Sequence, residues 1–349
     1  MDSADRVRAL FDATAAQTRP PAEGVRELVF QRASGIKPRP VRWAWDTAVP
    51  GAPPQLREGR FPIGSLVIAA GRAGVGKSQF AAWMTARITT GTLPGQFWGT
   101  PRCAVYAATE DSWAMTIVPR LIAAGADLER VYRVGVTDDN DIHARLTLPS
   151  DTRLLEKGIT DHDIVLVVMD PLLSLIDSSI NDYRAKEVRD ALEPLVAVAD
   201  RTKVLLLGLA HFTKAAGNDP LMLVSGSAAF GQLVRAAVAF ARDDDNDDSP
   251  GQPLIVEPQF VCSTIKNNLG REDLPSLAYR IQAHPIDTDE GQAWSRGCTS
   301  PADTPHDPYA RYSEMPRPAP IRMNRLSVRP RSSGSPTTSL PLTKPPAPR

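Results

Sequence analysis

The segment Gly71-Arg72-Ala73-Gly74-Val75-Gly76-Lys77-Ser78 constrains the fold of this chain more than any other feature of the sequence. It follows an apolar run, Ser65 to Ala70, that is typical of a buried strand. It precedes Ser78 to Thr90, which places Phe80, Met84 and Ile88 on one face of a predicted helix. A glycine-rich turn between a buried strand and a helix belongs to layered α/β proteins.

The spacing Gly-x4-Gly-Lys-Ser also indicates what the turn binds. Glycines let backbone N–H groups wrap a chain of phosphates, and the start of the helix adds a favourable dipole. We predict a P-loop in which Gly71 to Gln79 bind ATP, Lys77 reaches the β- and γ-phosphates, and the Ser78 hydroxyl is a ligand of Mg²⁺. A chance match in a Gly/Ala-rich loop is the alternative, but the flanking strand and helix disfavour it.

The central part of the chain repeats a short apolar run followed by a longer segment that can be helical. The predicted strands are Ser65 to Ala70, Cys103 to Ala108, Ile164 to Met169, Val204 to Leu209, Ala236 to Ala241 and Phe260 to Ile265. Strands that are apolar at nearly every position are buried on both faces, as in parallel sheets. The predicted fold class is therefore α/β, a mainly parallel sheet with helices on both faces.

Composition divides the chain into three parts. Residues 1–60 are predicted to be a short N-terminal arm, with an amphipathic helix near Val7, and a Pro-rich linker. Trp43 and Trp45 are expected to anchor this linker onto a surface of the protein. Residues 61–290 are predicted to form the ATPase domain. Residues 291–349 are rich in Pro, Ser and Arg, so we expect a disordered tail. An altered reading frame at the end of the gene would give the same abrupt change.

Charge and hydropathy exclude several classes of protein. The 40 Lys and Arg residues balance 40 Asp and Glu residues, so no global field attracts polyanions and any nucleic-acid contact must be local. No apolar run approaches the roughly 20 residues that a membrane span needs, and the first residues do not resemble a secretory signal. We expect a cytoplasmic protein that makes no membrane contact.

Two carboxylates follow predicted strands at positions suited to phosphoryl transfer. Asp170 closes the run Ile164 to Met169, where a Walker B aspartate would hold Mg²⁺. Glu110 comes just after the run Cys103 to Ala108, where a general base would orient water, and Asp111 is the second choice. The plainer interpretations are a strand-capping Asp before a proline and a solvated pair of turn residues.

His211 follows the run Val204 to Leu209 and is expected at the same edge of the sheet. There it could hydrogen-bond the γ-phosphate and report its presence to the next loop. The competing interpretation is a structural histidine that only makes hydrogen bonds at the end of its strand.

These features, in this order, resemble the RecA-like P-loop ATPases. Within them the chain resembles the RepA/DnaB-type hexameric replicative helicases, AAA-type ATPases of plasmid, phage and actinobacterial elements. The matching stretches are Trp43-x-Trp45, the P-loop, Thr109-Glu110-Asp111-Ser112, Met169-Asp170-Pro171, Ala210-His211-Phe212-x-Lys214, and Gly226-Ser227-x-Ala229-Phe230 with Arg235 downstream.

The resemblance implies a role for each matching residue. Glu110 would be the catalytic base, Asp170 the Walker B residue and His211 the sensor. Arg235 would be an arginine finger that reaches the ATP of a neighbouring subunit, and Lys266 a second cation acting in trans. A solvent-facing charge at a helix end is the plainer interpretation of Arg235.

The resemblance also implies partners. The chain would form a ring-shaped homo-oligomer, expected to be a hexamer, around single-stranded DNA. The loops Ser174 to Arg184 and Phe212 to Ser225 match those that line the channel of such rings, where Arg184, Lys186 and Lys214 would contact phosphates. These loops are short of aromatics and only modestly basic.

Three functions compete on this basis. The first is a ring-forming, ATP-driven DNA helicase or translocase in the replication of a plasmid, phage or integrated element. The second is a regulatory or scaffolding RecA-like ATPase that changes oligomeric state with nucleotide and does not unwind DNA. The third, a small-molecule kinase, should carry an arginine-rich lid, which the sequence does not show.

Overall fold

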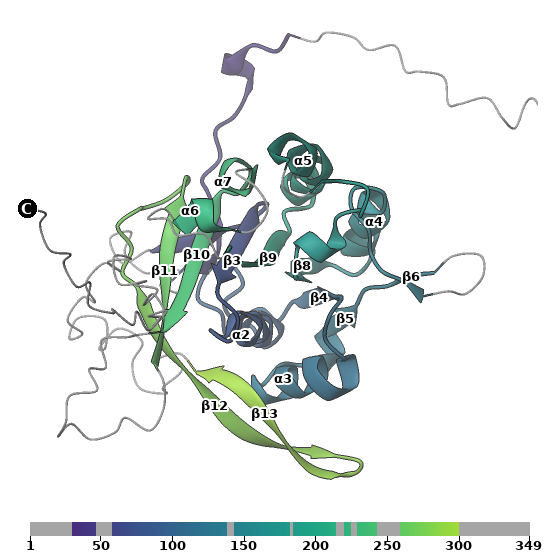
Figure 1. Cartoon of the computed structure of the whole chain (residues 1–349). Coiled ribbons are helices and arrows are strands. Elements are labelled where there is room, and N and C mark those ends of the chain that lie inside the picture. Colours follow the sequence, from purple (N-terminus) through teal and green to yellow (C-terminus); the bar gives the residue numbers. More distant parts are fainter. Residues whose placement is uncertain are drawn as a thin grey trace, which may run out of the picture. The chain divides into compact units, whose positions relative to one another are not determined.

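The computed structural model of the chain describes residues 30–46, 58–137, 143–181, 184–213, 220–224, 229–242 and 259–299 (Figure 1). The chain divides into two compact units, Met1–Pro40 and Val41–Arg349. The described part of the first unit holds one 3-10 turn, η1 (Ala33–Gly35), in which no residue is buried. The amphipathic helix predicted near Val7 lies outside the described residues.

The second unit is built on a nine-stranded sheet with the order β13-β12-β11-β10-β3-β9-β8-β4-β5. Its strands are β3 (Leu66–Gly71), β4 (Cys103–Ala108), β5 (Val131–Arg133), β8 (Ile164–Asp170), β9 (Leu205–His211), β10 (Ala236–Arg242), β11 (Gln259–Asn267), β12 (Leu277–Thr288) and β13 (Gly291–Thr299). The neighbours from β10 to β5 are parallel, and those from β10 to β13 are antiparallel. All six strands predicted from apolar runs are confirmed.

Helices cover both faces of this sheet (Figure 1). The elements between strands are α2 (Lys77–Thr89), η3 (Trp113–Ile117), α3 (Val118–Ala123), η4 (Leu128–Arg130), α4 (Thr152–Asp161), η5 (Leu173–Leu175), α5 (Ala185–Thr202), α6 (Pro220–Leu223) and α7 (Ala229–Leu233), with a small hairpin of β6 (Val136–Thr137) and β7 (His143–Ala144). One apolar core joins the sheet to α2 and α3, and the other joins it to α4, α5 and α7. Phe80, Met84 and Ile88 are buried in the first core, as predicted.

A hairpin that was predicted to be linker belongs to the second unit. Strands β1 (Trp43–Asp46) and β2 (Gly59–Pro62) pair antiparallel. The Trp45 ring lies 5.1 Å from that of Phe61 and 5.5 Å from that of Phe80, measured between centroids. Aromatic contacts with Phe61 and with Phe80 of α2 thus hold residues that the sequence analysis placed in the linker.

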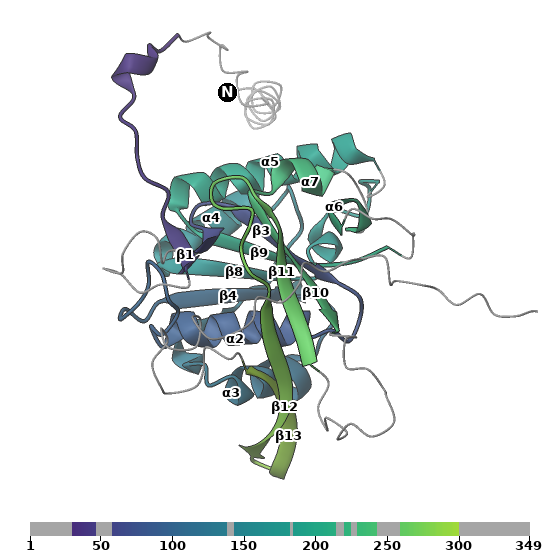
Figure 2. The ribbon, with the colours of Figure 1, turned by 90° about the vertical axis from the view of Figure 1, so that its left-hand side faces the viewer.

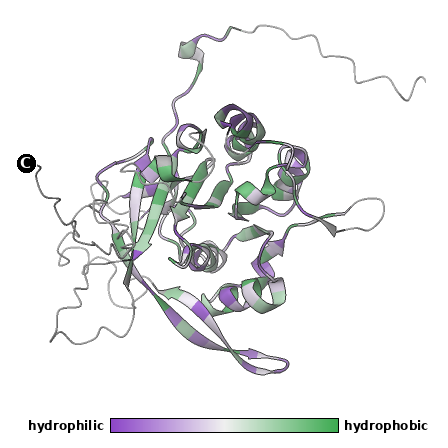
Figure 3. Cartoon of the chain, in the orientation of Figure 1, coloured by the Kyte–Doolittle hydropathy of each residue, from purple (hydrophilic) through white to green (hydrophobic). Residues whose placement is uncertain are grey.

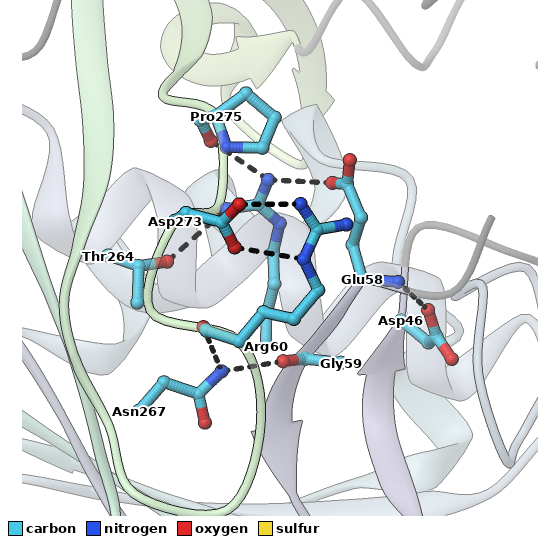
Figure 4. Close-up of polar contacts among 9 residues, drawn as sticks. Asp46, Glu58, Gly59, Arg60, Thr264, Asn267, Asp273 and Pro275 are labelled. Carbon is cyan, nitrogen blue, oxygen red and sulfur yellow. Dashed lines mark hydrogen bonds and ion pairs between the residues drawn. The ribbon is translucent and has the colours of Figure 1, made fainter. Parts of the chain in front are cut away.

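Arg60 ties this hairpin to β11 and to the segment that follows β11 (Figure 4). Its side chain is fully buried and pairs with Glu58 at 3.0 Å. The guanidinium also donates to the carbonyl of Pro275 at 2.9 Å and to the hydroxyl of Thr264 at 3.3 Å. Nearby, the Asn267 amide donates to the carbonyl of Gly59 at 2.8 Å. These contacts connect β2 to β11 and to the segment that follows it.

The last strand, β13, lies in the segment that the sequence analysis placed in the tail. Strand β13 pairs with β12 from Thr288↔Gly291 to Arg280↔Thr299, so residues 291–299 are part of the sheet. Beyond Arg280, β12 continues with β13 as a two-stranded ribbon that passes α2 and α3 (Figure 2). The central strands are mostly hydrophobic, whereas hydrophilic residues recur along the ribbon (Figure 3). The ribbon has no apolar run, which is why the sequence pattern did not predict it. Residues 300–349 lie outside the described part of the chain.

The predicted fold class, a RecA-like α/β core with a mainly parallel sheet and helices on both faces, is confirmed. Among the described residues, no helix combines the length and the apolar character that a membrane crossing requires.

Candidate active site

Four neighbouring strands deliver the P-loop, Glu110, Asp170 and His211 to one edge of the sheet. Strands β3, β9, β8 and β4 are adjacent and parallel, so their carboxyl ends coincide. Gly71 is opposite His211 in the β3–β9 register, and Ala108, two residues before Glu110, is opposite Asp170 in the β4–β8 register. Ligands of open α/β sheets bind at this edge.

The P-loop needs its glycines for reasons visible in the backbone. Gly74 has φ +80° and Gly76 has φ +88°, a left-handed conformation that side chains disfavour. Gly71 packs so closely on β10 that a Cβ there would lie 2.7 Å from the carbonyl oxygen of Phe240. Gly76 is also the N-cap of α2, so the turn ends where the helix dipole begins.

Lys77 is the first residue of α2, and its side chain folds back into the loop. Its Nζ donates to the carbonyl oxygens of Gly71 at 3.0 Å and Arg72 at 2.9 Å. The same Nζ lies 3.4 Å from His211 Nδ1. Burial lowers the pKa of Lys77 to about 8, although the charge of Asp170 acts in the opposite direction. A phosphate placed in the loop would favour the ammonium form.

His211 is held as a neutral imidazole beside this ammonium group. Burial and then the charge of Lys77 lower its pKa, while Glu110 and Asp170 act in the opposite direction. A neutral ring can accept a hydrogen bond from Lys77 at Nδ1 and keep Nε2–H as a donor. The side chain therefore suits the predicted role of a sensor for the γ-phosphate.

Ser78 and Asp170 form a pair of oxygen donors that fits Mg²⁺. The Ser78 hydroxyl hydrogen-bonds the Asp170 carboxyl group, and burial raises the pKa of that carboxyl above its usual range. A bound cation would relieve the cost of a buried carboxylate. The described residues contain no group of three or more His, Cys, Asp or Glu side chains suited to a metal. Phosphate and water oxygens would complete the coordination shell, as is usual for Mg²⁺.

Glu110 and Asp111 have different surroundings. Glu110 is exposed and accepts a hydrogen bond from Ser174 Oγ at 3.3 Å. Asp111 forms an ion pair of 2.5 Å with Arg120 of α3. Glu110 is thus the better candidate for a base that accepts a proton from water, because the Asp111 carboxylate is already paired.

Arg235 and Lys266 lie at the opposite edge of the sheet. The N–H of Arg235 donates to the carbonyl of Leu66, the first residue of β3, whereas the P-loop follows the end of β3. Lys266 is opposite Ala237 near the start of β10, and its Nζ donates to the carbonyl of Gly231 in α7. The charge of Arg235 contributes to lowering the pKa of Lys266, after burial, so the two cations are neighbours. Neither residue therefore lies with Lys77, Asp170 and His211 of the same chain.

The predicted DNA contacts are only partly described. Arg184, just before α5, is exposed and pairs with Glu187 at 3.0 Å. Lys186 in the first turn of α5 is exposed. Lys214, the loop residues 214–219 and 225, and the first three residues of the motif at Gly226 lie outside the described part of the chain.

Two residues near the site were not predicted. Arg120 pairs with Asp111, and its charge partly opposes the rise in the pKa of Asp170 that burial causes. Tyr279 on β12 donates a hydrogen bond from its hydroxyl to the carbonyl of Val75 in the P-loop. Neither belongs to a local motif, and Tyr279 is 204 positions from its partner, so only the folded chain brings them to the site.

A family model described as an AAA domain matches residues 31–217. The match covers more than half of the 349 residues and contains the P-loop, Glu110, Asp170 and His211. It ends before Arg235 and Lys266. A search of curated proteins found no match to the chain.

Proposed function

Since the chain belongs to the AAA-domain family and is a P-loop ATPase, we propose that it is a ring-forming motor that couples ATP hydrolysis to movement along single-stranded DNA. The observation that carries this proposal is the convergence of Lys77, Ser78, Asp170, His211 and Glu110 at one sheet edge. The helicase branch and the DNA substrate rest on the resemblance of the motifs.

Hydrolysis in this site would be an in-line displacement. Backbone N–H groups of the loop and Lys77 would hold the β- and γ-phosphates, and Glu110 would orient a water and accept its proton. The water oxygen bonds to the γ-phosphorus while the bond from that phosphorus to the bridging oxygen breaks, giving ADP and phosphate. Ser78 and Asp170 would hold Mg²⁺, which would supply positive charge next to the phosphate oxygens.

The cations at the opposite edge would complete the site of a neighbouring subunit. In a head-to-tail ring, one edge of each subunit faces the other edge of the next. Arg235, with Lys266 beside it, would then stabilise the charge that develops on the γ-phosphate of the neighbour. His211 would transmit the state of the γ-phosphate bound by its own chain to the loop after β9.

The proposed contacts to single-stranded DNA are Arg184 and Lys186, which are exposed beside the loop that follows β8. Such a contact would use phosphates, without base specificity, and would weaken steeply with salt.

The decisive experiment is ATP hydrolysis by the purified chain with and without single-stranded DNA, at low and moderate salt, beside the Lys77→Ala variant. We expect a Lys77-dependent rate that DNA stimulates several-fold, most strongly at low salt. Hydrolysis that depends on Lys77 but ignores DNA would favour a nucleotide-switched scaffold and remove the proposed channel contacts. Hydrolysis that survives Lys77→Ala would contradict the active site itself.

A further inference from the structure

The P-loop has a partner from the antiparallel end of the sheet. The Tyr279 hydroxyl donates a hydrogen bond to the carbonyl of Val75, and Tyr279 is 5% exposed. The tyrosine lies on β12, the strand that leaves the sheet and forms the ribbon with β13. The hydroxyl is therefore a buried donor that reaches the loop from outside the parallel core.

Two aromatic rings hold the Tyr279 ring in place. The Phe260 ring is stacked on it at 5.4 Å between centroids, with an interplanar angle of 21°. Phe240 on β10 meets it edge-on at 5.7 Å. Phe240 also touches the loop, because its carbonyl abuts Gly71. Aromatic contacts of this kind fix the orientation of a ring, so the hydroxyl has little freedom to move away from Val75.

The geometry of a peptide bond gives this contact a consequence for the phosphates. In a trans peptide the C=O of one residue and the N–H of the next point in opposite directions. Holding the Val75 carbonyl toward Tyr279 therefore points the Gly76 N–H away from Tyr279. A carbonyl that accepts a hydrogen bond also polarises its peptide group, which makes the N–H a better donor.

The same strand closes the outer side of Gly76. A Cβ on Gly76 would lie 2.5 Å from Cδ1 of Ile281 and 3.4 Å from the Tyr279 ring. Ile281 and Tyr279 thus pack directly against the residue whose N–H the hydrogen bond orients. Burial raises the pKa of Tyr279 well above its usual range, so the hydroxyl remains a donor at every pH at which the protein would be assayed.

We propose that Tyr279 is a positioning residue for nucleotide binding, which sets the Val75–Gly76 peptide so that the Gly76 N–H faces the phosphates before ATP arrives. This role rests on the proposed function of the P-loop. It also gives the ribbon a purpose within the ATPase, because β12 is the element that supplies the donor. The loop is then organised from two sides, by β3 and β10 within the core and by β12 outside it.

Tyr279→Phe in the full chain tests this role, because it removes the hydroxyl and keeps the ring. Titration with ADP and Mg²⁺ measures Kd, steady-state hydrolysis gives KM and kcat, and thermal unfolding gives Tm. A hydrogen bond of ordinary net strength predicts about a three- to tenfold increase in Kd and KM. We expect kcat to stay within about twofold, because the hydroxyl does not touch the reacting atoms.

Two control variants separate positioning from stability. Tyr132→Phe also removes a tyrosine hydroxyl, from a ring on β5 that packs against His162, the residue after α4. Ile159→Val trims a buried side chain of α4 in the other core and should lower Tm slightly. We expect both to leave the Kd of ADP unchanged.

The results distinguish the two proposals. If nucleotide binding depends on Lys77 but Tyr279→Phe leaves the Kd unchanged, the proposed role of Tyr279 is overturned and the ATPase remains. In that case Tyr279→Phe would show only a loss of Tm like that of Ile159→Val. A wild-type chain that bound no nucleotide would overturn both. A higher Kd in Tyr279→Phe alone, at a temperature well below every Tm, supports positioning.

Discussion

Lys77 is a buried ammonium group whose hydrogen bonds in the free protein go to the carbonyls of Gly71 and Arg72. Burial lowers its pKa to about 8. Carbonyl and imidazole acceptors carry no full charge, so they compensate less for lost hydration than a phosphate would. The free site is thus arranged to gain more from an anion than an exposed lysine would.

This arrangement predicts how nucleotide affinity depends on pH. The nucleotide raises the pKa of Lys77 above its value of about 8 in the free protein, so binding takes up a proton above that pH. Affinity should be flat near pH 7 and fall by up to about tenfold per unit above pH 8, until the pKa of the complex is reached. Measurements of the Kd of ADP and Mg²⁺ up to about pH 9.5 test this.

Lys77→Arg is the matched control, because a guanidinium stays charged throughout this range. Its affinity should be weaker but should not acquire the decline above pH 8. The same slope in both proteins would show that another group titrates.

The contrast between Glu110 and Asp111 gives a second prediction. Glu110→Gln should lower kcat by about a hundredfold or more, because it removes the proton acceptor. The KM for ATP should change by less than about threefold, since the phosphate contacts remain. Asp111→Asn is the neighbouring control and should have a smaller effect, because Asp111 is paired with Arg120. Steady-state hydrolysis measures both, and a larger loss of kcat in Asp111→Asn would reverse the assignment.

At the scale of elements, the hairpin of β1 and β2 is held by one buried cation. Arg60 donates hydrogen bonds to Glu58, Thr264 and the Pro275 carbonyl (Figure 4). Its Cζ also lies 5.5 Å from the centroid of the Trp45 ring. Arg60→Met would remove the hydrogen-bond donor of the Glu58 carboxylate and of the Pro275 carbonyl. We expect a loss of about 3 kcal/mol in the free energy of unfolding, typical of a buried pair that loses one partner.

Urea unfolding measures this loss, and Arg201→Met is the control. Arg201 makes two hydrogen bonds of 2.8 Å to Glu156, but both residues are on the surface. Exposed ion pairs contribute little, so this variant should unfold close to the wild type. Equal destabilisation by the two substitutions would contradict the importance of burial at Arg60.

The elements differ in how far sequence alone predicts them. Strands such as β8 and β9 are buried on both faces and are therefore apolar throughout, which any reading of hydropathy detects. Strands β12 and β13 mix polar and apolar residues without an apolar run, although Tyr279 and Cys298 pack into the core. β1 lies between prolines, and its burial depends on distant rings such as Phe80.

The site follows the same distinction. Asp170 and His211 are predictable because each ends an apolar strand, and parallel strands bring their carboxyl ends together. Arg120 and Tyr279 act through side chains that reach the site from a helix and from the ribbon. Their positions depend on tertiary packing, which no local spacing encodes.

At the scale of the whole molecule, the two groups of site residues lie at opposite edges of one sheet. The P-loop follows the end of β3, and the backbone of Arg235 is bonded to its first residue. A rigid sheet cannot bring Arg235 to the phosphates of its own chain. If Arg235 participates in hydrolysis, it must act on a second copy, and head-to-tail contact between copies is the geometry that allows this.

A mixing experiment tests whether Arg235 acts in trans. Lys77→Ala and Arg235→Ala should each be nearly inactive alone. The first lacks the lysine that binds the phosphates, and the second lacks the arginine that each subunit would give to its neighbour. In an equal mixture that exchanges subunits, an Arg235→Ala chain supplies an intact P-loop and a Lys77→Ala chain supplies an intact Arg235. About one quarter of the interfaces then bring an intact P-loop and an intact Arg235 together. Hydrolysis should rise to about a quarter of the wild-type rate.

The control mixture combines Lys77→Ala with Glu110→Gln, whose substitutions fall in the same P-loop site. Every interface of that mixture then lacks either the lysine or the base, so no activity should return. Recovery in the first mixture alone assigns Arg235 to the neighbouring subunit. If the first mixture is no more active than its two components measured separately, while both variants still form oligomers and exchange, Arg235 does not complete a neighbour's site.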